Sequence, residues 1–376
     1  MQLTLSDAAR RNAAPYLFGT EADAAAHALA GGQYGHSPLT DQFENEVAAF
    51  LGTPDIVAVA SGTFALHFAL LAAGIRPGDE VIVPSMTFCA TVQAVLAAGA
   101  RPRFCDVDPD TLCAGPEQIE AALTPDTRAV MPVLFAGRAV DLAPIEPLLT
   151  ERGITVVEDA AHGFGSLQGT TRVGATGRLT CFSFGPIKNL TCGQGGAVVP
   201  TTVEQAATVR RLRLLGVVED MAQRADSTTY TVAGPGYRAP LSAINAAVGL
   251  VQLGHFAEIE RRRRHLWTRY RDALAHLEQV TLVDIDPDRS VPSMCVVRVE
   301  NRDRIWRQLH ELGLGVGVHY PPNHLQPAFA DFTRPLPVTE HVADRLMSLP
   351  FHLALTDDDV GQITAALVTA VRVGSQ

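Results

Sequence analysis

Short hydrophobic runs alternate with longer helical stretches through residues 55–200, and this alternation is the strongest constraint on the fold. The expected strands are 56–60, 79–83, 102–107, 129–135, 155–158, 180–184 and 196–199, and the first helices are 64–73 and 90–98. Few charges fall within the strands, so both faces of the sheet are expected to be buried. The pattern predicts an α/β fold with a mostly parallel central sheet flanked by helices.

The pattern changes after Leu241. Residues 242–277 are predicted to form one long helical region with room for a kink, and shorter strands and helices follow from residue 280. We therefore predict a large domain over residues 1–245 and a smaller α+β domain over residues 246–376. The run of arginines at 261–264 lies among acidic residues, which favours a solvated helix face over a nucleic-acid surface.

Composition excludes several classes of protein. A net charge of −10 argues against binding to nucleic acid or to an anionic membrane. The 6 cysteines are scattered without CxxC spacing, which is typical of buried thiols in a reducing compartment. The 12 histidines show no HExxH or similar spacing, so no metal site is predicted.

No targeting or membrane segment is predicted. Residues 1–11 contain no apolar stretch long enough for a secretory signal. The most apolar window, residues 57–75, is interrupted by Ser61, Gly62, Thr63 and His67, so a strand, a turn and a helix fit it better than a membrane span. We expect a cytoplasmic protein.

An acidic pair closes one of the predicted strands. Asp159 follows a hydrophobic run and stands at the carboxyl end of its strand, where open α/β sheets bind ligands. A carboxylate there can pair with a protonated ring nitrogen and keep a pyridinium cationic. Asp159 can instead cap the next helix, and the segment alone leaves both interpretations open.

Lys188 is the only lysine in the chain, because every other basic residue of the Lys/Arg type is arginine. It lies in a Gly/Pro-rich and otherwise apolar loop that follows the strand predicted at 180–184. Desolvation lowers the pKa of a lysine and frees its amine to form an imine with a carbonyl group. Arginine cannot readily lose its proton, so a single lysine here favours a nucleophile over an ordinary exposed loop residue.

Two other strand ends have residue types that suit a cofactor. Ser61, Gly62 and Thr63 precede an Ala/Leu-rich helix, where backbone N–H groups and a hydroxyl can bind a phosphate or simply cap the helix. Phe88 follows another strand and can stack on a planar cofactor or belong to the core.

Taken in their order along the chain, these motifs resemble those of the DegT/DnrJ/StrS family of sugar aminotransferases, a branch of the fold type I pyridoxal phosphate enzymes. The resemblance covers nearly the whole chain. The segments that carry it are 43–44, 61–63, 84–91, 99–108, 158–162, 182–196, 237–238, 246–253, 319–321, 324–327 and 348–350.

The resemblance implies pyridoxal 5'-phosphate as the cofactor. It makes Lys188 the internal Schiff-base lysine and Asp159 the partner of the pyridine nitrogen. Phe88 would stack on the ring, and His162 would lie near the ring oxygen. The phosphate would be bound by Gly62, Thr63 and Ser183. The residues implied near the substrate are Tyr237, Arg238, His319, Tyr320 and His324, and a structural role in the small domain is equally open for the three residues at 319–324.

Three positions depart from the family pattern. Relatives have an Asn before the Tyr-Arg pair that reaches the cofactor phosphate of the neighbouring subunit, whereas this chain has Gly236. Gln194 stands where an acidic residue is common, and Gly185 where relatives often have His, Tyr or Phe. These changes flank the cofactor and put the cross-subunit contact and the shape of the substrate pocket in question.

The resemblance predicts an aminotransferase that moves an amino group from an amino acid, L-glutamate or L-glutamine, to a nucleotide-linked keto-sugar in amino sugar or antibiotic biosynthesis. It also implies a homodimer with shared active sites. The alternatives are a pyridoxal phosphate enzyme acting on a keto-cyclitol or another non-sugar carbonyl, and a non-catalytic regulatory or sensing protein. A sugar dehydratase is disfavoured because those relatives replace the lysine with histidine.

Overall fold

The structure is a computed structural model that describes residues 5–32, 34–219, 223–224 and 226–372. The prediction about a secretory signal concerns residues 1–11, of which 1–4 lie outside the described residues.

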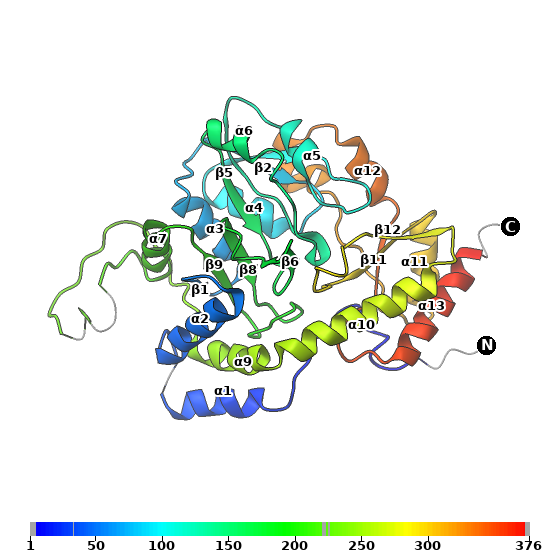
Figure 1. The fold of residues 1–376 in the computed structure, drawn as a ribbon, viewed down its shortest axis with the longest axis horizontal. Coiled ribbons are helices and arrows are strands. Elements are labelled where there is room, and N and C mark those ends of the chain that lie inside the picture. The colour runs from blue at the N-terminus through cyan, green and yellow to red at the C-terminus, as the bar shows by residue number, and fades with distance from the viewer. Residues whose placement is uncertain (1–4, 33, 220–222, 225, 373–376) are drawn as a thin grey trace.

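A seven-stranded sheet forms the centre of the molecule (Figure 1). Its order is β1-β9-β8-β5-β4-β2-β3, with β8, β5, β4, β2 and β3 parallel and β9 antiparallel to both β8 and β1. The strands are β1 Val57–Val59, β2 Glu80–Pro84, β3 Arg101–Cys105, β4 Thr127–Val130, β5 Thr155–Asp159, β8 Leu179–Ser183 and β9 Gly196–Val199. The predicted α/β fold with a mostly parallel central sheet flanked by helices is confirmed.

Helices cover both faces of this sheet (Figure 1). A buried cluster that includes Phe68, Val92 and Val209 joins one face to α3, α4 and α7, and a second cluster that includes Phe43 lies on the other face. The helices from the N-terminus to the one that follows β9 are α1 Glu21–Ala30, α2 Pro38–Leu51, α3 Gly62–Ala72, α4 Cys89–Ala97, α5 Pro116–Glu120, η1 Phe135–Gly137, α6 Glu146–Glu151 and α7 Val203–Arg213. Strands β6 Leu167–Gln168 and β7 Thr171–Arg172 form a separate small ribbon.

The C-terminal part contains a three-stranded antiparallel sheet with helices, as the predicted smaller α+β unit requires. Its elements are β10 Val280–Leu282, β11 Cys295–Val299, α11 Arg302–Glu311, η2 Asn323–Leu325, η3 Pro327–Phe332, α12 Pro337–Ala343, β12 Leu346–Leu349 and α13 Asp357–Arg372. The N-terminal segment also lies against this part, because Phe351 N donates to Asn12 O (2.8 Å) and Gly315 N to Ala9 O (3.0 Å). The division at residue 245 stays a prediction.

The predicted long helical region is two helices, α9 Ala243–Gly254 and α10 Phe256–Leu274, which meet at His255. The expectation of a solvated arginine face on α10 is wrong for Arg263, which is buried and donates to Pro292 O (3.2 Å). Arg264 donates to Ser290 O (3.0 Å), and Arg262 donates to Leu355 O. These arginines join α10 to neighbouring loops, because guanidinium groups can satisfy buried carbonyl groups.

Between α7 and α9 the chain extends away from the sheet, on the left of Figure 1. Backbone bonds join the two sides of this excursion near its base: Ala233 N donates to Gly216 O (2.9 Å) and Val218 N to Thr231 O (3.0 Å). We call residues 214–219 and 226–238 the arm.

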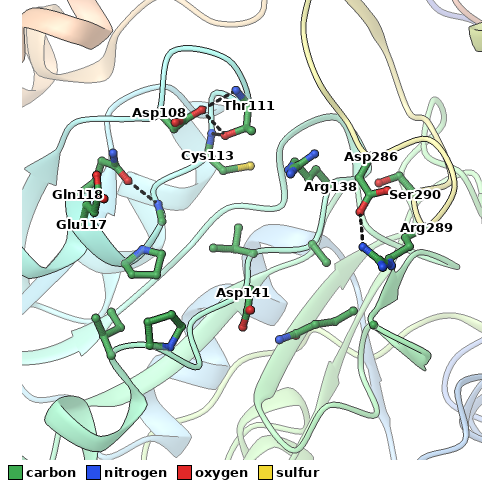
Figure 2. Close-up of a pocket in the computed structure, with 18 of the residues that line it drawn as sticks. Asp108, Thr111, Cys113, Glu117, Gln118, Arg138, Asp141, Asp286, Arg289 and Ser290 are labelled. Carbon is green, nitrogen blue, oxygen red and sulfur yellow. Dashed lines mark hydrogen bonds and ion pairs between the residues drawn. The ribbon is translucent and has the colours of Figure 1, made fainter.

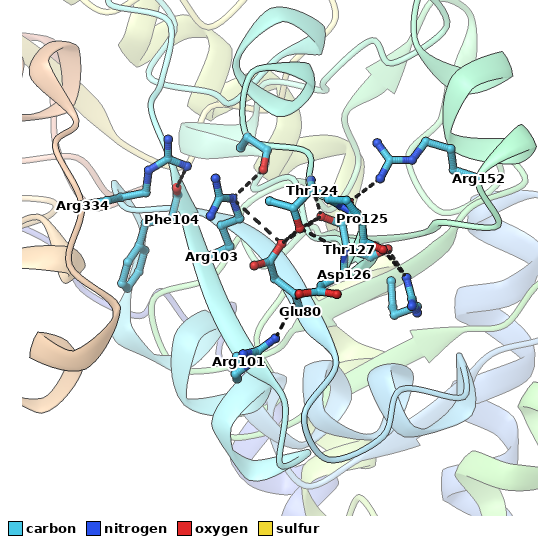
Figure 3. Close-up of polar contacts among 12 residues, drawn as sticks. Glu80, Arg101, Arg103, Phe104, Thr124, Pro125, Asp126, Thr127, Arg152 and Arg334 are labelled. Atoms are coloured by element: carbon cyan, nitrogen blue, oxygen red, sulfur yellow. Dashed lines mark hydrogen bonds and ion pairs between the residues drawn. The ribbon is translucent and has the colours of Figure 1, made fainter.

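The two edges of the parallel strands differ in chemistry. At the amino edge, Glu80 Oε1 accepts from Thr124 Oγ1 (2.6 Å) and Thr127 Oγ1 (2.9 Å), and Arg103 Nε lies 3.9 Å from it (Figure 3). These contacts join β2, β3 and β4, and the carboxylate of Glu80 is engaged in them. The residues predicted to act on a ligand lie at the carboxyl edge, as is usual in open α/β sheets.

No helix among the described residues combines the length and apolar character needed to cross a membrane.

Candidate active site

Several chain segments meet at the carboxyl edge of the sheet. In the strand registers, Gly196 at the start of β9 lies beside both Val59 and Ser183. Asp159 ends β5, the strand next to β8. Because β1 runs parallel to β8, the start of α3 at Gly62 lies at this same edge.

Asp159 is buried, and its carboxylate is held from two sides. Oδ2 accepts from Thr91 Oγ1 (2.7 Å), and Oδ1 accepts from Ala161 N (3.1 Å). Burial raises the pKa of Asp159, although these hydrogen bonds and the positive charge of Lys188 oppose the rise. A buried carboxylate of this kind is stabilised when a cation is placed against it. Thr91, on α4, was not singled out from the sequence.

Lys188 lies in the loop after β8, and its backbone N donates to Gly185 O (3.2 Å). Burial lowers the pKa of its amine to about 8, and the Asp159 carboxylate opposes this shift. A substantial fraction of the amine is therefore neutral near pH 8, whereas an ordinary lysine would be almost fully protonated.

The loop that carries Lys188 is anchored by its neighbour Asn189. The Asn189 amide donates to Val291 O at 2.9 Å and lies 3.4 Å from His162 O and from Phe164 O. Asn189 thus ties the lysine loop to the segment after Asp159 and to the chain that precedes β11. This residue was also missed, because its partners are distant in sequence.

His162 and Tyr320 form an aromatic wall beside Lys188. Their rings are nearly parallel with centroids 6.2 Å apart, and the Tyr320 hydroxyl lies 3.3 Å from His162 Nε2. Burial, together with the positive charge of Lys188, holds the pKa of His162 well below its usual range, so its ring is neutral. His162 Nδ1 is buried and has no partner among the described residues. The ring of Phe88 is 55 % exposed and lies 5.8 Å from that of Tyr320, so it is free to cover a planar group.

The start of α3 packs directly against Ser183. A Cβ placed on Gly62 would lie 2.7 Å from Ser183 Cβ and 3.0 Å from Ser183 Oγ. Ser61 caps the helix by accepting from Phe64 N (3.2 Å). The first N–H groups of a helix, at Gly62 and Thr63, have no intrahelical acceptor. Together with the Ser183 hydroxyl they form a cradle that suits a phosphate.

A small cavity adjoins Lys188, and residues from both ends of the chain line it. The lining includes Asn12, His162, Ser293, His319, Tyr320 and Phe351. His319 Nδ1 is 2.8 Å from Ser348 Oγ, and Asn12 donates to Ser348 O (3.0 Å). Burial and the charge of Lys188 lower the pKa of His319. The structure therefore brings His319 and Tyr320 to the lysine, and it adds Asn12 and Ser348, which sequence reasoning missed.

His324 does not line this cavity. It is fully buried, with Nδ1 2.7 Å from Ser85 Oγ and Nε2 3.3 Å from Glu340 Oε1. Its backbone N donates to the same Ser85 hydroxyl (3.0 Å). These contacts favour the structural interpretation that the sequence left open for His324.

Tyr237 and Arg238 also lie apart from the cavity, at the base of the arm. The ring of Tyr237 packs on α3, with centroids 5.3 Å from His67 and 5.4 Å from Phe68. Arg238 is exposed and its backbone forms a bridge with Leu214. Within one subunit neither reaches the lysine.

Gly236 has no room for a side chain. A Cβ at this position would lie 2.2 Å from Gly216 N and 2.5 Å from Leu215 C, both of them backbone atoms. The Asn of the family pattern cannot stand here unless the arm changes its backbone.

A cavity of about 890 Å³, much larger than the one beside Lys188, lies elsewhere (Figure 2). Asp108, Gln118, Arg138, Asp141 and Arg289 are among its lining, and none of the predicted site residues is. Size therefore does not identify the site, whereas a lysine of lowered pKa close to a buried carboxylate does.

The residues at Lys188 fit pyridoxal phosphate. They combine a lysine of lowered pKa, a buried carboxylate for the pyridine nitrogen, an exposed aromatic ring and a helix N-terminus for the phosphate. Within the described ranges, no three His, Cys, Asp or Glu side chains are grouped so as to hold a metal ion.

The comparison with family models matches residues 16–368 to the DegT/DnrJ/EryC1/StrS aminotransferase family. Among solved structures, DesV from S. venezuelae in complex with a ketimine intermediate is 36 % identical, with a TM-score of 0.86, and the match covers 93 % of this chain and 94 % of that one. The sugar aminotransferase CalS13 from Micromonospora echinospora is 31 % identical, with a TM-score of 0.88 and coverage of 95 % and 99 %. The PLP form of the putative sugar aminotransferase Spr1654 from Streptococcus pneumoniae is 25 % identical, with a TM-score of 0.89 and coverage of 99 % of each chain.

Proposed function

Because the chain belongs to the DegT/DnrJ/EryC1/StrS aminotransferase family, we propose that it moves an amino group from L-glutamate or L-glutamine to a nucleotide-linked keto-sugar. The protein is a pyridoxal phosphate-dependent aminotransferase, as its family and structural neighbours are. The proposal extends to the donor, the acceptor and a role in amino sugar or antibiotic biosynthesis. It also includes a cytoplasmic homodimer with shared active sites.

One observation carries the proposal: the single lysine of the chain has a pKa of about 8 and lies beside a buried carboxylate. When bound, pyridoxal phosphate supplies an aldehyde that condenses with amines and a ring that accepts electron density. Lys188 Nζ would hold this aldehyde between turnovers. As a free amine, Lys188 would take the proton from the α-carbon of the amino donor and pass it on to the cofactor.

The surrounding residues orient the reactants. Asp159 holds the pyridine nitrogen in its protonated state, and Thr91 holds the carboxylate in place. His162, whose imidazole is neutral, directs one of its own nitrogens toward the ring oxygen of the cofactor. It adds no positive charge next to the lysine. His319 and Tyr320, which line the cavity beside Lys188, contact the acceptor in this proposal.

The first test is the absorbance spectrum of the purified protein with pyridoxal phosphate, compared with that of Lys188→Ala. A visible Schiff-base band in the wild type that L-glutamate or L-glutamine bleaches, and that is absent from the variant, supports the proposal. Since the chain has no other lysine, only its α-amino group can compete. A band that no amino donor bleaches would contradict the donor half of the proposal, and an unchanged band in Lys188→Ala would contradict the role of the lysine.

Keto-sugars and keto-cyclitols as acceptors then separate the two acceptor classes. In this experiment the aminated form of the enzyme, prepared with the donor, is mixed with each acceptor. Return of the visible band with a nucleotide-linked keto-sugar, and not with a keto-cyclitol, is the expected result.

A further inference from the structure

Gln194 lies beside the cradle formed by Gly62 and Ser183. A Cβ placed on Gly185 would be 3.7 Å from Gln194 Oε1, 3.7 Å from Ser183 Oγ and 4.0 Å from Lys188 Cγ. The amide of Gln194, the hydroxyl of Ser183 and the stem of Lys188 therefore surround the same space, which Gly185 leaves open by having no side chain.

The backbone fixes Gln194 at this place. Its neighbour Gly195 accepts a hydrogen bond from Phe184 N (2.8 Å). Two residues on, a Cβ at Gly196 would lie 2.5 Å from Ser61 C and 2.7 Å from Gly62 N. The chain just after Gln194 thus packs on the peptide that begins α3, and Gln194 lies two residues before that contact.

The amide of Gln194 is free to bind a ligand. Its side chain is exposed, and it forms no hydrogen bond with any residue that the structure describes. The oxygen and nitrogen of a glutamine amide exchange places by rotation, so its NH₂ can face the same space. A phosphate dianion accepts several hydrogen bonds, and the helix N–H groups with one hydroxyl leave some of its oxygens without a donor.

The arm does not supply this donor at the family position. Gly236 has no room for the Asn that relatives use, because the backbone of Gly216 and Leu215 occupies the space. In the same chain Gln194 replaces the acidic residue that is common at this position, so the loss of an amide at 236 coincides with the gain of one at 194.

We propose that Gln194 donates its side-chain amide to the phosphate of the cofactor within the same subunit. It thereby replaces the amide that the family pattern takes from the neighbouring subunit. This inference rests on the proposed function, since it requires pyridoxal phosphate to be bound at Lys188.

The test compares Gln194→Ala and Gln194→Glu with the wild type as cofactor-free proteins. Each is titrated with pyridoxal phosphate and, separately, with pyridoxal, which lacks the phosphate. The Kd for pyridoxal phosphate is expected to rise in Gln194→Ala, which loses a donor. It is expected to rise further, about tenfold or more over the wild type, in Gln194→Glu, which adds a negative charge. The Kd for pyridoxal is expected to change little in either variant.

Gln279→Glu is the matched control, because Gln279 is exposed, lies between α10 and β10 and forms no hydrogen bond with the described residues. It makes the same change of charge and is expected to leave both Kd values unchanged. The ³¹P chemical shift of bound pyridoxal phosphate gives a second readout that is expected to move in the two Gln194 variants only.

Equal affinity of all variants for pyridoxal phosphate would overturn the inference, as would an equal loss for pyridoxal and its phosphate. Neither result would affect the proposed function, which is tested separately by the Schiff-base band of the wild type, its bleaching by an amino donor and its loss in Lys188→Ala. Circular dichroism of the cofactor-free proteins establishes that each variant is folded before it is titrated.

Discussion

Thr91 Oγ1 donates to Asp159 Oδ2 across 2.7 Å, and both side chains are buried. Thr91 Oγ1 also lies 2.8 Å from Thr87 Oγ1, so two hydroxyl groups in series, one just before α4 and one on it, end on the carboxylate. This bond lowers the pKa of Asp159 against the effect of burial. Thr91 therefore both orients the carboxylate and favours its ionised form, which is the state that can pair with a protonated pyridine nitrogen.

Thr91→Val keeps the shape of the side chain and removes this bond. The pKa of Asp159 is expected to rise further, and kcat is expected to fall about tenfold, with a loss of about 1–2 kcal/mol in the free energy of unfolding. Steady-state kinetics and denaturant unfolding measure the two effects. Thr364→Val is the matched control, since the Thr364 hydroxyl is buried and bonds to Val360 O within α13. A Thr91→Val enzyme with wild-type kcat would show that Asp159 needs no such support.

Two adjacent buried carboxylates on β5 are expected to differ in role. Asp159→Asn should lower kcat at least about a hundredfold with a small effect on folding, because a neutral amide cannot hold the pyridine nitrogen protonated. Glu158 pairs with Arg178 (3.0 Å) and accepts from Thr180 (2.9 Å). Glu158→Gln should therefore cost about 3–5 kcal/mol of stability and leave the folded enzyme active. The reverse pattern in kinetics and unfolding would contradict both assignments.

The pKa of Lys188 sets a pH dependence for Schiff-base formation. Because burial lowers this pKa to about 8, the neutral fraction of the amine rises about tenfold per pH unit well below pH 8 and increases only about twofold in all above it. The rate at which cofactor-free protein and pyridoxal phosphate form the visible band should follow the same curve. A lysine with an ordinary pKa would give a rate that still rises about tenfold per pH unit between 8 and 9.5, and that result would refute the lowered pKa.

Variants of His319 and His324 are expected to behave differently, because His319 lines the cavity beside Lys188 and His324 has a structural role. His319→Ala should change the KM for the acceptor or kcat by about tenfold and alter unfolding little, because His319 lines the cavity beside Lys188. His324→Ala should cost about 2–4 kcal/mol of stability, because it leaves a cavity and removes the partner of Ser85. Its KM, measured on folded enzyme, should equal that of the wild type. A raised KM in His324→Ala would return this residue to the substrate site.

Gly62→Ala tests the close contact between α3 and β8. The added Cβ would lie 2.7 Å from Ser183 Cβ, so the helix N-terminus must move away from the Ser183 hydroxyl. The Kd for pyridoxal phosphate is expected to rise about tenfold or more. Gly361→Ala on α13 is the control, because a Cβ there meets no atom within 4 Å, and it should be neutral or stabilising. Unchanged affinity in Gly62→Ala would mean that the cradle does not bind the phosphate.

The sequence by itself determined the kind of fold and the chemistry of the central pair. Alternating hydrophobic runs are a local property, so the parallel sheet and the place of Asp159 at the end of β5 could be predicted from spacing alone. The restriction of lysine to position 188 is visible without any structure. Family membership follows from the order of the motifs along the chain, which folding does not change.

Only the tertiary structure decided which distant residues share the site. Asn12 and Ser348 are 336 positions apart, yet they contact each other beside Lys188, and the sequence predicted neither of them as a site residue. His324 matches a family motif as well as His319 does, but packing buries it against Ser85. The room at Gly185 and its lack at Gly236 are likewise set by backbone atoms far away in the sequence. Contacts of this kind depend on how whole elements pack, whereas periodicity records only the neighbours of a residue along its own helix or strand.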